Sequence, residues 1–93
     1  MEGYKRIAAV QLTSQDAELY NNPNGAIIKT ILLHNTTSGE VDVTLSIDSV
    51  IFVIKLQAKE TITFDRVIIT NELKAKGNGV NIHVSGIQLK GGN

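Results

Sequence analysis

The sequence predicts an all-β protein, a single antiparallel β-sandwich with jelly-roll-like connections. Apolar and polar residues alternate from 41 to 48, the period-two pattern of a strand that buries one face and exposes the other. The pair Asn78-Gly79 is typical of a tight hairpin turn. The apolar parity of the last strand shifts at Gly86, which indicates a β-bulge at Ser85-Gly86 that returns both apolar groups to one face.

Composition sets the size and class of the domain. The chain has 93 residues and a hydrophobic content of 42%, which suit one globular domain over residues 1–93. No window of a dozen residues shows the apolar spacing of an amphipathic helix. Residues 1–6 are expected to form an N-terminal arm, and residues 90–93 a frayed tail.

Charge and targeting signals argue against several classes of partner. Nine basic and nine acidic residues give zero net charge, so no broad electrostatic footprint for nucleic acid or an anionic membrane is expected. The chain has no cysteine, which excludes a disulfide framework and a thiolate metal site. The stretch Met1-Glu2-Gly3-Tyr4-Lys5-Arg6 does not resemble a signal peptide, and no apolar run is long enough to span a bilayer. We therefore expect no nucleic acid partner, no membrane and no Sec export.

The first part of the chain predicts short strands separated by a strong break. A strand is expected over residues 4–12, followed by a polar turn. Residues 17–20 fit either a short strand or one helical turn. The stretch Asn21-Asn22-Pro23-Asn24-Gly25 predicts a firm break, because Pro23 fixes φ and Asn24-Gly25 suits a tight turn.

Residues 29–47 are expected to form the central β-hairpin. Ile31-Leu32-Leu33 is apolar on both parities, so its strand, over residues 26–35, is expected to be central and covered on both faces. Thr36-Thr37-Ser38-Gly39 is the turn that leads to the alternating strand over 41–48. Asn35-Thr36-Thr37 fits a glycosylation sequon, but without a secretion signal it predicts only a turn.

Short strands and polar turns are predicted for the rest of the chain. Further strands are expected at 50–54, 61–64, 67–69, 73–76 and 80–89. A turn is expected at 57–60, a polar break at 71–72, and a hairpin turn at Gly77-Asn78-Gly79. The core is predicted to include Ile31, Leu33, Val43, Leu45, Phe64, Val80, Ile82 and Val84.

No arrangement of residues in the sequence predicts catalysis. His34 and His83 are the only histidines, and neither a cysteine nor an HxH or HExxH spacing supplies further metal ligands. Ser14 and Ser46 are not part of a nucleophile elbow, and Gly77-Asn78-Gly79 lacks the pattern of a phosphate loop. We therefore expect a protein that is not an enzyme, holds no metal and binds no cofactor.

An apolar run in the middle of the chain predicts an interface. Residues 50–54 are apolar on both parities, so one row of side chains can fill the core while the other faces outward. Either a returning loop or another subunit would cover the outer row, and we favour another subunit. The predicted interface residues are Val50, Ile51, Phe52, Val53 and Ile54, together with Tyr4, Lys5 and Arg6 of the N-terminal arm.

Several strand and turn motifs follow one another in a recognisable order. They are Lys5-Arg6-Ile7-Ala8, Ala26-Ile27-Ile28-Lys29-Thr30-Ile31, His34-Asn35-Thr36-Thr37, Val41-Asp42-Val43-Thr44-Leu45 and Val80-Asn81-Ile82-His83-Val84-Ser85-Gly86. In this order, the chain resembles the small all-β virion structural proteins of tailed bacteriophages and prophages. The chain departs from that pattern at Asn22-Pro23-Asn24-Gly25, where the family has a Pro-Ala-Gly-like stretch, and at the short Gly77-Asn78-Gly79 loop.

The resemblance implies a virion component, assembled in the cytoplasm of a host bacterium, without enzymatic activity or cofactor. Small size, few aromatic residues and neutral charge favour a capsid decoration or cement protein that packs on the major capsid protein. The alternative is a tail, baseplate or fibre-associated module that contacts tail proteins, and a host-encoded β-sandwich adaptor is a third reading. The apolar run predicts a homo-oligomer that forms through the outer face of residues 50–54. Because three-fold symmetry is common in phage head and fibre components, the resemblance implies that this homo-oligomer is a trimer.

Overall fold

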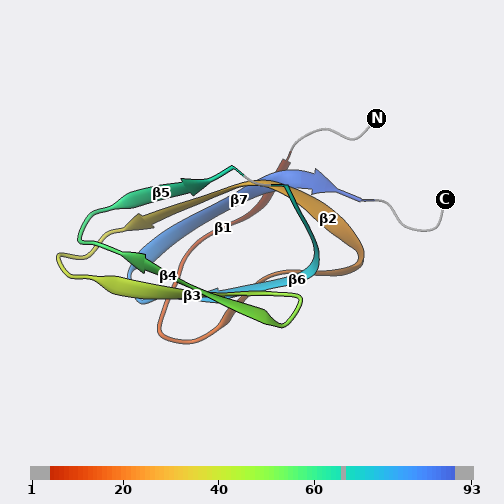
Figure 1. The fold of residues 1–93 in the computed structure, drawn as a ribbon. Coiled ribbons are helices and arrows are strands. Elements are labelled where there is room, and N and C mark those ends of the chain that lie inside the picture. The colour runs from red at the N-terminus through yellow and green to blue at the C-terminus, as the bar shows by residue number, and fades with distance from the viewer. Residues whose placement is uncertain (1–4, 66, 90–93) are drawn as a thin grey trace.

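The computed structural model describes residues 5–65 and 67–89, and these ranges contain strands and no helix (Figure 1). The strands form one antiparallel hydrogen-bonded sheet. They are β1 (Lys5–Gln11), β2 (Ala17–Asn35), β3 (Val41–Ile47), β4 (Val50–Leu56), β5 (Thr61–Phe64), β6 (Ile68–Lys76) and β7 (Val80–Gln88). The predicted all-β antiparallel fold is confirmed, and the jelly-roll character of its connections stays a prediction.

The sheet folds over on itself to make two facing layers. Its strand order is β1-β7-β2-β6-β3-β4, with β5 paired to β2. Residues 26–35 of β2 pair with β7, whereas residues 17–21 pair with the second half of β6. One layer therefore holds β1, β7, the second half of β2 and β5. The other holds β4, β3, the second half of β6 and the first half of β2 (Figure 1).

The two layers join where β2 and β6 bend together. Asn21 pairs with Glu72 and Ala26 with Thr70, so residues 22–25 of β2 lie opposite Asn71 alone. The Asn71 side-chain amide donates to the carbonyl oxygens of Asn22 and Pro23, at 3.1 and 3.0 Å. These polar residues bend the strands, and pairing resumes beyond them. The breaks predicted at 21–25 and 71–72 are therefore wrong, and residues 17–20 are strand.

The two predicted hairpins, one over residues 29–47 and one closed by Gly77-Asn78-Gly79, are both wrong. In the described ladders β2 pairs with β5, β6 and β7 but not with β3, and β6 pairs with β2 and β3 but not with β7. The turns at 36–40 and 77–79 instead carry the chain from one layer to the other. The hairpin in this region is β3–β4, closed by Asp48 and Ser49 with φ values of 51° and 71°. Positive φ at both turn residues is the pattern of a type I′ turn.

The core lies between the layers and matches the predicted set closely. Ile31, Leu33, Val43, Leu45, Val80, Ile82 and Val84 are buried. Phe64 is only partly buried, because β5 is an edge strand. The core also contains Leu12, Ile28, Leu56 and Leu73, which were not predicted. Leu32 is 40% exposed on the outer face of β2, so the expectation that both faces of this strand are covered is wrong.

Gly86 is required by close packing, not by the predicted bulge in β7. The extra residues lie in the neighbouring strands: the register shifts at Ile7 of β1 and at Lys29 of β2. Gly86 stays in phase with the buried Val84. A Cβ atom at Gly86 would overlap the carbonyl oxygen of Ile27, so only glycine fits between the strands.

The Asn35 side chain hydrogen-bonds to the connections that cross between the layers at one end of the molecule. Its buried side-chain amide donates to the carbonyl oxygens of Gly39 and Gln57 at 2.7 and 3.0 Å, and its Oδ1 accepts from the Thr37 N–H at 2.9 Å. Thr36 donates to the carbonyl oxygen of Gly79 through its N–H and its hydroxyl, at 3.0 and 2.6 Å. These bonds join the connections at 36–40, 57–60 and 77–79. The sequon therefore forms a turn, as predicted, with its asparagine inside the protein.

Replacing Asn35 with Asp is expected to destabilise the fold by about 3 kcal/mol at neutral pH, because a carboxylate would then face two carbonyl oxygens. Denaturant unfolding followed by circular dichroism measures the loss. Asn81→Asp is the matched control, since Asn81 is exposed on β7 and should change stability by less than about 0.5 kcal/mol. An equal loss in both variants would contradict the role given to Asn35.

Gly86→Ala is expected to cost about 2 kcal/mol or more, because β2 and β7 must separate to admit the methyl group. Gly39→Ala is the control, since nothing lies within 4 Å of a Cβ placed there. Thermal unfolding should show a clear loss for the first variant and little change for the second. A Gly86→Ala protein as stable as the parent would show that the strands have room to move apart.

Candidate functional site

The predicted interface residues form an exposed apolar edge strand. β4 pairs with β3 on one side and ends the strand order of its layer. The exposed fractions are 56% for Val50, 58% for Ile51, 49% for Phe52 and 64% for Val53. Ile54 is partly buried. The run therefore lies on the surface, and the interface itself stays a prediction.

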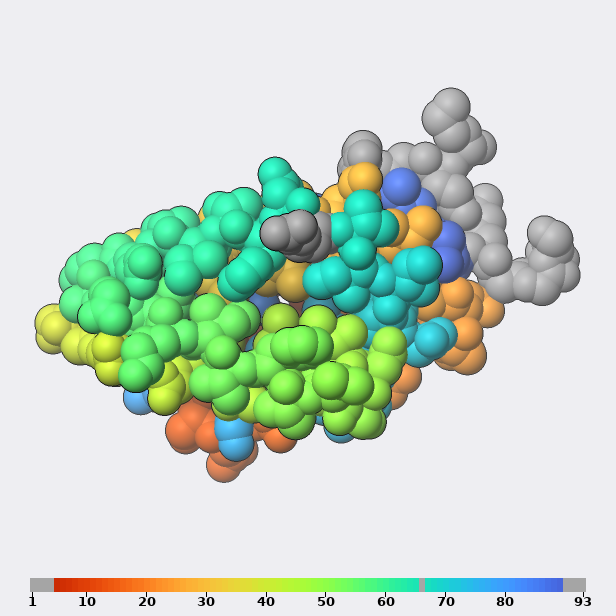
Figure 2. All heavy atoms as spheres, in the orientation of Figure 1, coloured from red at the N-terminus to blue at the C-terminus, as the bar shows by residue number. Residues whose placement is uncertain are grey.

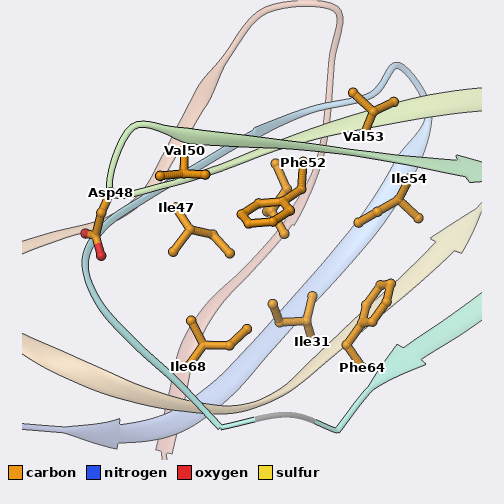
Figure 3. Close-up of a pocket in the computed structure, with 10 residues that line it drawn as sticks. Ile31, Ile47, Asp48, Val50, Phe52, Val53, Ile54, Phe64 and Ile68 are labelled. Carbon is orange, nitrogen blue, oxygen red and sulfur yellow. The ribbon is translucent and has the colours of Figure 1, made fainter.

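Side chains on both faces of β4 are exposed to solvent. Phe52 lies opposite Leu45, and Ile54 opposite Val43, so these side chains share the inner face with buried partners. Ile51 and Val53 point to the outer face, as Figure 3 shows for Val53. The sequence predicted that one row would fill the core. The inner row instead stays half exposed at Val50 and Phe52, because the facing layer ends at β5.

An apolar groove of about 520 Å³ separates β4 from β5 and the start of β6. Figure 2 shows the surface hollowed between these two bands of the molecule. In Figure 3 the side chains of β3 and β4 face those of β2, β5 and β6 across it. Its main lining residues are Ile31, Ile47, Phe52, Ile54, Phe64 and Ile68.

The groove opens progressively along β4. Leu56, at the end near Asn35, is fully buried, and Ile54 is partly buried. Phe52 and then Val50 are about half exposed. The two layers therefore meet at the Asn35 end and separate toward the Asp48-Ser49 turn. The sequence assigned Ile31 and Phe64 to the core but contained no signal that β5 ends its layer, so the groove was not predicted.

Asp48 fixes the open end of the groove to β6. Its Oδ1 accepts hydrogen bonds from the Asn71 N–H at 2.9 Å, the Glu72 N–H at 3.0 Å and the Thr70 hydroxyl at 3.0 Å. The backbone N–H groups of Asn71 and then Glu72 lower the pKa of this carboxyl below its ordinary value. The turn of the β3–β4 hairpin is therefore held in place even though the hairpin edge is free.

The predicted N-terminal contribution lies away from this strand. Lys5 and Arg6 pair with Gly86 and Ser85 as part of β1, at the opposite end of the strand order from β4. They are exposed but belong to the sheet, not to a free arm. Tyr4 lies outside the described residues, as do the other arm residues 1–3 and the predicted tail at 90–93.

The two histidines lie on one face of the other layer. Leu32 pairs with His83, and His34 with Asn81, which places the histidines diagonally across β2 and β7. The His34 Nδ1 lies 2.7 Å from the Thr61 hydroxyl oxygen. Within residues 5–65 and 67–89, no three His, Cys, Asp or Glu side chains form a group able to hold a metal ion.

No protein-family model and no curated protein matches this chain. Among the described residues there is no helix suited to crossing a membrane. The candidate site is thus described by its own geometry: the exposed β4 edge, the apolar groove behind it and the Asp48 carboxylate that holds the β3–β4 turn to β6.

Replacing Asp48 with Asn tests the anchor. Asn keeps an acceptor oxygen and tolerates positive φ, so the variant removes mainly the charge. Because the folded-state pKa of Asp48 lies below that of the unfolded chain, its stabilisation is complete above about pH 4 and is lost as pH falls through the folded-state pKa. The parent is expected to be more stable than Asp48→Asn at pH 7, by less than about 1 kcal/mol because the group is exposed.

The measurement is urea unfolding of both proteins between pH 2.5 and 7, compared as a difference so that other titrating groups cancel. The difference should shrink toward the acid end. Asp48→Gly, which keeps the turn conformation but removes the acceptor, should be less stable than Asp48→Asn at every pH. A parent–variant difference that stays constant with pH would contradict the role of the charged carboxylate.

Proposed function

We propose that this chain is a non-enzymatic structural component of a bacteriophage particle that assembles through the exposed edge of β4. The observation that carries the proposal is the apolar strand itself: four consecutive apolar residues, Val50 to Val53, are each at least 49% exposed beside an apolar groove. Single exposed apolar residues are ordinary on protein surfaces, whereas a contiguous run marks a contact with another molecule.

Within this class, a capsid decoration or cement protein is the proposed role. The family resemblance supports it, and so do the small size and the even balance of nine basic and nine acidic residues, which favour a packing role over receptor binding. The proposed partners are further copies of the chain and the major capsid protein. The place of action is the virion, after assembly in the host cytoplasm.

The alternative within the same class is a tail, baseplate or fibre-associated module. It would use the same apolar edge to bind tail proteins, so the surface alone does not separate the two roles. The number of copies per particle does separate them, because head lattices present many more equivalent sites than tails.

Quantitative mass spectrometry of purified particles is the test. A decoration protein should be present on the order of hundreds of copies per particle, and a tail module in about a few dozen or fewer. Particles made without the protein should release their genome at lower temperature if it reinforces the head. Particles from a producing strain that contain no copy of the chain would overturn the proposal.

A further inference from the structure

The free edge of β4 lacks the features that normally keep sheet edges apart. Natural edges carry proline, inward charges, bulges or very short strands. β4 pairs with β3 in unbroken register over all seven residues, and residues 50–54 contain no charge, glycine or proline. Lys55 is its single charged residue, and it lies beyond the apolar run. We infer that β4 pairs antiparallel with β4 of a second copy, around a two-fold axis at Phe52. This inference deepens the proposed self-association and rests on it.

The hairpin turn determines which backbone groups are free. In a two-residue hairpin the closing pair, here Ile47 and Val50, exchanges hydrogen bonds, and every second pair along the ladder does the same. The backbone groups of Phe52 and Ile54 are therefore directed at β3. Those of Ile51 and Val53 are directed at the free edge. A second β4 would find an alternating row of donors and acceptors there.

The sequence of β4 matches itself in one antiparallel register. With Phe52 facing Phe52 of the second copy, Val50 faces Ile54 and Ile51 faces Val53. Every contact in the run is then apolar against apolar, and Lys55 faces Ser49. A shift of two residues in one direction would set Lys55 against Ile51, and the opposite shift would set Asp48 against Ile54. The register centred on Phe52 is therefore the favoured one.

This arrangement also covers the groove. Residues directly opposite each other across two paired strands point to the same face. The two Phe52 side chains, which are on the inner face, would therefore meet at the axis, and the mouths of the two grooves would face each other. The grooves would merge into one space closed to water from the β4 side. A single second copy thus covers both the strand edge and the inner row.

The area involved predicts a dimer that depends on concentration. The exposed parts of Val50, Ile51, Phe52 and Val53 amount to a few hundred Å² per copy, less than the roughly 800 Å² per partner of a standard stable interface. Backbone hydrogen bonds along the edge add to this contact. We therefore expect dimers at high protein concentration and monomers on dilution. Antiparallel self-pairing has two-fold symmetry, so the trimer implied by the family resemblance would require a different contact.

Paired charge variants test both the edge and the register. Ile51→Lys with Val53→Lys sets like charges against each other, as does Ile51→Glu with Val53→Glu. Each double variant alone should dimerise at least about tenfold more weakly than the parent in analytical ultracentrifugation. Mixing the two should give a one-to-one heterodimer. The chain with Ile51→Lys and Val53→Glu should dimerise by itself, because the register sets position 51 against position 53.

A cysteine scan gives a readout that does not depend on charge. The chain has no cysteine, so a single introduced thiol reports one contact. Phe52→Cys should form a disulfide-linked dimer on mild oxidation. The proposed register sets position 52 of one copy directly opposite position 52 of the other, and directly opposite residues of two paired antiparallel strands lie within disulfide reach. Ile69→Cys is the control, since Ile69 is 67% exposed and lies on β6, where it pairs with Ile27 of β2. Circular dichroism confirms that each variant is folded.

The outcomes are distinct. Loss of dimerisation in the like-charged variants, rescue on mixing and a cross-link specific to Phe52→Cys would support the pairing. A monomer at all concentrations, a trimer, or equal cross-linking at Ile69→Cys would overturn it. A monomeric protein that is abundant in particles would contradict this inference but not the proposed function. A β4-paired dimer that is absent from particles would support this inference and contradict the proposed function.

Discussion

The side-chain amide of Asn35 is the interaction on which the arrangement of the strands depends most. It is buried at the end of β2 and bonds to the connection that leads to β3 and to the one that leads to β5. An amide supplies two N–H donors and an acceptor, whereas a carboxylate supplies no donor and a hydroxyl only one. These connections carry the chain between the two layers. The amide therefore sets the distance between the layers where β4 ends and β5 begins.

The groove follows from the same constraint. One side of the molecule is closed by β2 and β6, which bend continuously from one layer to the other. The other side ends in two edge strands, β4 and β5, and Asn35 bonds to the connection between them. Leu56 is buried there, whereas Val50, at the other end of β4, is exposed. The Asp48 carboxylate holds this exposed end of the hairpin to β6. The apolar surface is thus the side of the sandwich that this chain leaves without a closing strand.

The proposed role in assembly would use this open side directly. The apolar edge is hydrogen-bonded to β6 through the turn at Asp48 and to β3 along the ladder, so it presents a preformed surface, and binding there would order little additional chain. Contacts of a few hundred Å² are weak one at a time and become durable when a lattice repeats them. The outer face of the opposite layer, with both histidines, stays free for other contacts in such an assembly.

The sequence alone determined the all-β class, the position of most strand segments and most of the core, because alternation and turn residues act over a few neighbouring positions. The row from Val41 to Ile47 and the buried parity of Val80, Ile82 and Val84 could be read in this way, and so could the apolar double row of β4. Strand partners could not be read. The turns at 36–40 and 77–79 look like hairpin turns, yet they cross between layers. Likewise, Asn21 to Gly25 looks like a break, yet β2 bends and continues. Only the tertiary structure decided these pairings, because a strand offers hydrogen bonds on both edges, and which neighbour takes them depends on how the whole chain closes its core.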